Sequence, residues 1–244
     1  MKTSILQLYR FEFEARIFIS LSIVLLVCLT SFLGFPAVPS NMIIAGNWLG
    51  MDPSRSLRVG FVFVTLVMIL ATILRMWAGT VLSSPRIMAF RIQKDVLATS
   101  GPYHISRNPI YLADLVAFCG FSLCLNPVGL AMPVLLYIHY IQLITYEEHN
   151  LCSQFGVAFE AYRKATPRLI PNLTSLKRYR TAFSEFYINR DGFRHNAQYL
   201  LFIPGFVILK LFKLRETNLP ETLVLSVAIS IVCIFCSRIC SSLI

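Results

Sequence analysis

Residues 110–146 read IYLADLVAFCGFSLCLNPVGLAMPVLLYIHYIQLITY, two apolar runs separated only by Asn126-Pro127. The runs, residues 110–125 and 128–146, come close to the roughly 20 residues that a membrane-crossing helix needs. Asn favours turns and Pro cannot continue a helix that precedes it. The stretch therefore predicts a tight hairpin of two helices that span a membrane.

Further apolar runs lie on both sides of this hairpin, which makes its helices the third and fourth of about six predicted spans. The run nearest the amino terminus resembles the core of a signal peptide, but Pro36 and Pro39 stand where a cleavage site would fall, so we expect a retained helix. The fifth run contains Pro204 and Lys210 and could instead lie at the interface. The predicted fold is an all-α, polytopic membrane bundle, whose other spans are 17–35, 59–82, 197–214 and 222–244.

The composition of the whole chain agrees with a membrane protein. Of its 244 residues, 56% are hydrophobic and 14% are charged, with a mean hydropathy of +0.67. Soluble domains have roughly 45–50% apolar and about 25% charged residues, so soluble and disordered classes are excluded. The seven cysteines lie mostly in apolar runs and are interpreted as packing residues, without a disulfide framework.

The distribution of the basic residues predicts the orientation. The chain carries 22 Lys and Arg against 12 Asp and Glu, and most of the basic residues lie before the first span, between the second and third, and after the fourth. Basic loops stay on the cytoplasmic side. We therefore expect both termini and both long loops to be cytoplasmic, with the basic run 177–180 against lipid headgroups rather than nucleic acid.

Polar residues stand at both outer ends of the hairpin. Arg107-Asn108-Pro109 precedes the third span, and Glu147-Glu148 follows the fourth. At about 1.5 Å per residue, the lengths of the third and fourth spans differ by less than one helical turn. Arg107 and Asn108 should therefore lie near Glu147 and Glu148, in a pocket at the cytoplasmic membrane face.

This combination of side chains suits a ligand with several charges. Carboxylates can hold an amine, an arginine fork can bind a carboxylate, and aromatic faces can accept a second cation. S-adenosylmethionine has all three groups, and other zwitterions fit as well. The plainer alternative is that the acidic pair only marks where the helix leaves the bilayer and points into water.

Several blocks in a fixed order carry a family resemblance across residues 74–171. They are Gly101-Pro102-Tyr103, Arg107-Asn108-Pro109-x-Tyr111, Glu147-Glu148-x-x-Leu151, Phe155-Gly156, Tyr162 and Pro167-Arg168-x-Ile170-Pro171. In order and spacing this region resembles the isoprenylcysteine carboxyl methyltransferase and phospholipid methyltransferase superfamily. The pattern divides the chain into amino-terminal membrane helices (1–73), a methyltransferase-like core (74–171), and a polar linker with carboxy-terminal hydrophobic helices (172–244).

The resemblance implies an integral-membrane methyltransferase that uses S-adenosylmethionine. Asn108 departs from the family pattern, which has His there; Asn keeps a hydrogen-bond donor and an acceptor but cannot titrate. No catalytic residue is assigned, although His104 and His149 are the nearest candidate bases for an acceptor that must lose a proton. The cofactor-binding residues implied by the match are Tyr103, Arg107, Asn108, Pro109, Tyr111, Glu147, Glu148, Tyr162 and Arg168.

The methyl acceptor stays open. A lipophilic acceptor that enters from the bilayer is expected, either a prenylated cysteine carboxylate or a lipid headgroup amine. The alternatives are an NADPH-dependent reductase of the sterol-reductase type and a non-enzymatic scaffold or transporter. Membrane lipids are the expected partners, no metal or nucleic acid is expected, and the membrane could be the bacterial inner membrane or the endoplasmic reticulum.

Three polar residues lie within the apolar runs. Arg75 is expected to reach toward the cytoplasmic face or to line the site. Asp114 is expected to be a site residue or the partner of Arg75, because a carboxylate within a membrane is functional by default. His139 is interpreted as a residue that hydrogen-bonds between helices.

Overall fold

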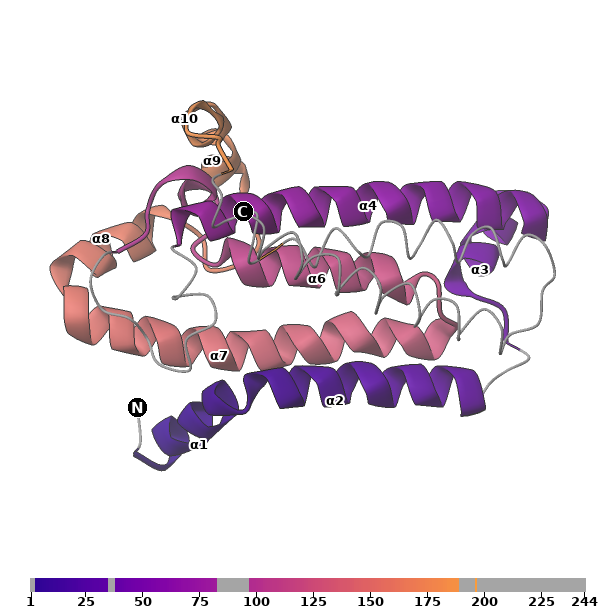
Figure 1. The fold of residues 1–244 in the computed structure, drawn as a ribbon, viewed down its shortest axis with the longest axis horizontal. Helices are drawn as coiled ribbons and strands as arrows, with labels where there is room; N and C mark the ends of the chain where they lie inside the picture. Colours follow the sequence, from indigo (N-terminus) through magenta and orange to yellow (C-terminus); the bar gives the residue numbers. More distant parts are fainter. Residues whose placement is uncertain (1–2, 35–37, 83–96, 189–195, 197–244) are drawn as a thin grey trace, which may run out of the picture.

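The computed structural model describes residues 3–34, 38–82, 97–188 and 196. Four helices lie side by side in the order α2, α7, α6 and α4, and neighbouring helices run in opposite directions (Figure 1). The elements are α1 (Thr3–Glu14), α2 (Arg16–Leu29), the π-helical turn η1 (Thr30–Gly34), α3 (Asn41–Trp48), α4 (Pro53–Val81), the 3₁₀ turn η2 (Gly101–His104), α6 (Pro109–Ser122), the 3₁₀ turn η3 (Pro127–Leu130), α7 (Ala131–Phe155), α8 (Val157–Ala165), α9 (Leu173–Leu176) and α10 (Tyr179–Ser184).

The all-helical prediction is confirmed for the part of the chain that the structure describes, which contains no strand. Three helical stretches are long and apolar enough to cross a membrane, namely Arg16–Leu33, Pro53–Val81 and Pro127–Phe155. The predicted third span is shorter than expected, because α6 has only 14 residues and ends at Ser122. The predicted spans 197–214 and 222–244 lie outside the described residues.

Local capping explains where two of these elements begin. The Asp52 carboxylate accepts a hydrogen bond from the backbone N–H of Arg55 at 3.0 Å, and Pro53 occupies the first position of α4. Asn126 repeats this arrangement in the turn between α6 and α7, where its side chain accepts from the N–H of Val128 at 3.1 Å. The Asn-Pro pair that predicted the turn therefore starts η3, which leads into α7, while α6 has already ended at Ser122.

Asn126 also ties the turn to the amino-terminal part of the chain. Its amide donates to the carbonyl of Ser31 at 2.9 Å and accepts from the Ser31 hydroxyl at 2.8 Å. The Asn41 amide in turn donates to the carbonyls of Ser122 and Asn126 at 3.0 and 2.9 Å. These buried bonds fix α2, α3 and the α6–α7 turn to one another at the end of the bundle opposite the candidate site.

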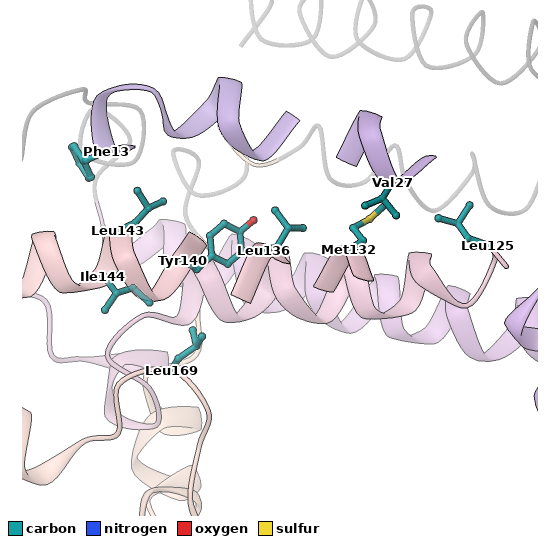
Figure 2. Packing of buried hydrophobic residues seen from close by; sticks show 9 residues of the cluster. All are labelled: Phe13, Val27, Leu125, Met132, Leu136, Tyr140, Leu143, Ile144 and Leu169. Atoms are coloured by element: carbon teal, nitrogen blue, oxygen red, sulfur yellow. The ribbon is translucent and has the colours of Figure 1, made fainter. Parts of the chain in front are cut away.

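An apolar seam packs α7 against α1 and α2. Met132, Leu136, Tyr140 and Leu143 follow a spacing of three to four residues, so they share one face of α7. Figure 2 shows this row facing Val27 of α2 and Phe13 of α1. The amino-terminal helices are thereby held along α7 from Met132 to Tyr146, next to the turn that carries Glu147 and Glu148.

Inside the bundle, α4 and α6 share an ion pair. The guanidinium of Arg75 binds the carboxylate of Asp114, and both side chains are nearly buried, at 12% and 13% exposed. The prediction that Asp114 is the partner of Arg75 is therefore confirmed. Because α4 packs closely on α6, this pair lies between two apolar helices rather than in solvent.

We expect Asp114→Leu to destabilise the protein by about 3–5 kcal/mol, because it leaves the Arg75 charge buried without its carboxylate. The double variant Arg75→Leu/Asp114→Leu removes both charges and should recover most of that loss. Unfolding of the detergent-purified variants gives the comparison. Equal stability of the single and double variants would show that the pair does not hold α4 on α6.

Candidate active site

The predicted site residues come from four segments that meet at one end of the bundle, which we call the site end. Tyr103 lies in η2, and Arg107 and Asn108 follow it immediately before α6. Pro109 is the first residue of α6, and Tyr111 lies in its first turn. The carboxy-terminal half of α7 supplies Glu147 and Glu148, α8 supplies Tyr162, and Arg168 follows α8.

Glu148 is the centre of this end of the bundle. Arg107 donates from Nε and Nη2 to Glu148 Oε1 at 2.9 and 2.7 Å, and Arg168 donates from Nε and Nη2 to Oε2 at 3.1 and 2.8 Å. Glu148 is only 6% exposed. The predicted proximity of Arg107 to Glu148 is therefore confirmed. Both carboxylate oxygens are satisfied by protein groups, so Glu148 acts in this structure as an internal anchor for two arginines.

The remaining nitrogen of the Arg107 guanidinium, Nη1, is held by backbone carbonyls. It donates to the carbonyl of Arg163 at 2.8 Å and also to the carbonyl of Thr166. The arginine thus joins α7 to the end of α8. We expected an arginine fork to bind the carboxylate of a ligand, but the Arg107 fork is directed at Glu148 and at this backbone.

The segment immediately before α6 is paired with the segment immediately after α8, through hydrogen bonds to backbone carbonyls. The N–H of Arg107 donates to the carbonyl of Pro167 at 3.0 Å, and the Ser106 hydroxyl donates to the carbonyl of Leu169 at 2.8 Å. The Asn108 amide donates to the carbonyl of Arg168 at 2.8 Å. The side chain at position 108 therefore supplies an N–H to this pairing, a task that does not require a titrating group.

Glu147 has a different environment from its neighbour. It accepts a hydrogen bond from the Tyr111 hydroxyl at 2.8 Å, and the Tyr111 ring lies 5.2 Å from the Tyr140 ring, centroid to centroid. The side chain is half-buried. Two adjacent carboxylates thus have separate surroundings, because Glu148 is bracketed by guanidinium groups and Glu147 faces aromatic residues.

Tyr103 and Tyr162 close the side of the site formed by η2 and α8. The Tyr162 hydroxyl donates to the carbonyl of Tyr103 at 2.9 Å, and the Tyr103 side chain is 5% exposed. Burial raises the pKa of both phenols well above the ordinary value for tyrosine. Both hydroxyls therefore keep their protons at neutral pH and can donate hydrogen bonds.

The two candidate bases lie toward the periphery. His149 is exposed on α7, and His104 of η2 lies 3.3 Å from the carboxylate of Glu185, which follows α10. Glu185 also accepts from the backbone N–H of Gly101 at 2.5 Å. Gly101 has a φ of +57°, and a Cβ there would lie 3.1 Å from the Trp77 indole nitrogen, so this close approach requires glycine.

Through its contacts with Gly101 and His104, Glu185 attaches the segment after residue 172 to η2. Phe183 and Phe186 lie on the Trp77 ring at centroid distances of 5.1 and 5.2 Å, so α10 contacts both α4 and η2. The sequence did not single out Glu185, since one carboxylate in a polar stretch has no distinguishing pattern. The contacts anchor the beginning of the 172–244 segment next to the candidate site.

We expect this attachment to depend on pH. The Gly101 N–H, together with His104, lowers the pKa of the Glu185 carboxyl. A lowered pKa means that the stabilisation is complete above the ordinary glutamate value of about 4.3 and is lost as the pH falls through the value in the folded state. Glu185→Gln should therefore lower the thermal unfolding midpoint at pH 7, and its difference from the wild type should shrink as the pH falls below the ordinary glutamate value of about 4.3. A difference that persists at the lower pH would contradict this assignment.

Comparisons with known proteins agree with the resemblance. Residues 59–158 match the family model described as phospholipid methyltransferase. This segment includes most of α4, all of η2, α6 and α7, and the acidic pair, so it is similar to the superfamily of membrane methyltransferases that the sequence blocks indicate.

Two curated bacterial proteins are similar to the chain. One is the nickel-cobalt-cadmium resistance protein NccN of Alcaligenes xylosoxydans xylosoxydans, 25% identical over 62% of this chain and 65% of its own length. The other is the cobalt-zinc-cadmium resistance protein CzcN of Cupriavidus metallidurans, 28% identical over 43% of this chain. The chain covers less than two thirds of either relative, 65% and 46%. No solved structure matches significantly. In the described ranges, no three His, Cys, Asp or Glu residues are placed to hold a metal ion.

Proposed function

We propose that the chain is a membrane-embedded methyltransferase that binds S-adenosylmethionine at the site end of the bundle and methylates a lipophilic acceptor. The observation that carries this proposal is the cluster of Tyr111, Glu147, Glu148 and Arg107 within the segment that matches the phospholipid methyltransferases. Membrane-spanning helices on the same segment support an acceptor that arrives from the bilayer.

The residues present fit the proposed cofactor. It would supply a methyl group activated by a positively charged sulfur, together with an ammonium and a carboxylate. Glu147 offers a carboxylate oxygen on a half-buried helix face, and the rings of Tyr111 and Tyr140 stand beside it. Carboxylates and aromatic faces both attract cations. Glu148 contributes indirectly, since it fixes Arg107 and Arg168 and thereby the segments that frame Glu147.

The demands on the protein are modest. The acceptor atom must be held in line with the methyl group at about 3–3.5 Å, in a place that excludes water. A carboxylate acceptor is already ionised and needs no base, whereas a headgroup amine must release a proton. The buried phenols of Tyr103 and Tyr162 keep their protons, so they can orient a ligand but not deprotonate an acceptor.

Two vesicle preparations test the acceptor class. Purified protein is incubated with S-adenosylmethionine labelled in its methyl group, in phosphatidylethanolamine vesicles or with a farnesylated cysteine carboxylate in phosphatidylcholine vesicles. Label that enters the organic phase with only one of them identifies a headgroup amine or a prenylcysteine carboxylate. Transfer to neither acceptor, with binding of S-adenosylmethionine intact, would contradict both acceptor classes.

A further inference from the structure

The junction between α1 and α2 lies against the turn of α7 that carries the acidic pair. The Phe13 ring is 5.4 Å from the Tyr146 ring, centroid to centroid, and Phe13 is only 4% exposed. The guanidinium carbon of Arg16 lies 4.3 Å from the centre of the Phe13 ring. The Arg16 side chain is therefore held at the site end by its contact with Phe13, which packs on Tyr146 next to the acidic pair.

Arg16 brings a third positive charge to the site. Through Phe13, its guanidinium lies at the turn of α7 that contains Tyr146 and, directly after it, Glu147. The other two site arginines, Arg107 and Arg168, each direct two nitrogens at Glu148. This third charge near Glu147 comes from a helix outside the family-matched segment 59–158.

We propose that Arg16 is a ligand-binding residue of this site: it recognises the anionic group of a zwitterion whose cationic group binds Glu147. This inference rests on the proposed function and deepens it. Arg16 and Glu147 together suit a molecule that carries an anionic group and an ammonium a few bonds apart. Two sources have this chemistry, the carboxylate and ammonium of the cofactor's amino-acid end, and the phosphate and ammonium of a phosphatidylethanolamine headgroup. Arg16 is the first residue of Arg16–Leu33, a helical stretch that is long and apolar enough to cross a membrane. At the end of such a stretch, both the cofactor and the lipid headgroup are accessible.

The same part of the chain offers a matched control. Arg10 lies on α1 and pairs with Glu14 at 2.9 Å, with side chains 68% and 52% exposed. Arg16→Gln and Arg10→Gln each remove one positive charge from the amino-terminal segment, so a general loss of membrane or cofactor attraction would affect both. Arg16→Lys keeps the charge and loses the fork geometry.

Two measurements separate the sources. Calorimetric titration with S-adenosylhomocysteine reports the cofactor, and methyl transfer in phosphatidylethanolamine vesicles reports KM for the lipid. A contact with the cofactor predicts that Arg16→Gln weakens S-adenosylhomocysteine binding about 10- to 100-fold. A contact with the lipid predicts a similar rise in KM for the lipid, with unchanged S-adenosylhomocysteine affinity. In either case Arg10→Gln behaves as the wild type and Arg16→Lys is intermediate.

The inference is overturned if Arg16→Gln and Arg10→Gln give the same values in both measurements while the wild type binds S-adenosylhomocysteine. A wild-type protein that does not bind S-adenosylhomocysteine overturns the proposed function, and the role of Arg16 with it. Circular dichroism of the variants in detergent controls for folding, and an Arg16→Gln protein that is unfolded is replaced by Arg16→Lys in both assays.

Discussion

Glu148→Gln is expected to lower the free energy of unfolding by about 3 kcal/mol or more and to abolish methyl transfer. The carboxylate neutralises two guanidinium groups, and the Arg107 side chain is only 8% exposed. Removing one partner of a buried ion pair leaves an uncompensated charge, which costs about 3–5 kcal/mol. An amide in this position would also direct an N–H group at one of the arginines. Thermal or denaturant unfolding of the detergent-purified variant measures the loss.

Glu160→Gln is the matched control for this experiment. Glu160 pairs with Arg163 at 2.9 Å on the surface of α8, with side chains 36% and 48% exposed. An exposed pair of this kind contributes no more than about 1 kcal/mol. If Glu148→Gln is no less stable than Glu160→Gln, then the bracketed carboxylate does not hold the site end together.

Glu147→Gln is expected to have the opposite profile, with stability retained and ligand binding lost. The amide oxygen can still accept the Tyr111 hydrogen bond, so the free energy of unfolding should change by less than about 1 kcal/mol. Removing the charge should weaken S-adenosylhomocysteine binding about 10- to 100-fold, the usual value for a hydrogen bond to a charged group. Calorimetric titration and unfolding of the same preparation give both quantities.

Tyr111→Phe separates the charge of Glu147 from its orientation. This variant keeps the carboxylate and removes the hydroxyl that holds it, so the affinity should fall less than in Glu147→Gln. Wild-type affinity in Glu147→Gln, together with a large loss in Tyr111→Phe, would mean that the tyrosine rather than the carboxylate contacts the ligand.

The sequence predicted the meeting of Arg107 and Glu148 because helix geometry converts residue counts into heights along the bundle. The partner of Arg75 was one of the two roles expected for Asp114, because a carboxylate within a membrane is functional by default. The sequence could not say which of the two adjacent glutamates the arginines bind. That choice depends on the rotation of α7 about its axis and on the path of the chain after α8, and neither leaves a periodic pattern.

Other contacts have no sequence signal at all. The carbonyls of Arg163 and Thr166 that accept from Arg107 are backbone groups present at every residue. In the sequence, Arg16 is one of several basic residues before the first span and has nothing to distinguish it. Its contact with Phe13 follows from the packing of α1 on α7. The 14-residue length of α6 was also missed, because Leu123, Cys124 and Leu125 are apolar but belong to the turn.

We propose that the Glu147–Glu148 end of the bundle binds S-adenosylmethionine. Calorimetric titration of the purified full chain with S-adenosylhomocysteine and, separately, with NADPH tests it most directly. We expect one S-adenosylhomocysteine bound per chain, a much weaker affinity in Glu147→Gln, and no heat of binding with NADPH. Binding of NADPH without binding of S-adenosylhomocysteine would contradict this proposal and favour a reductase.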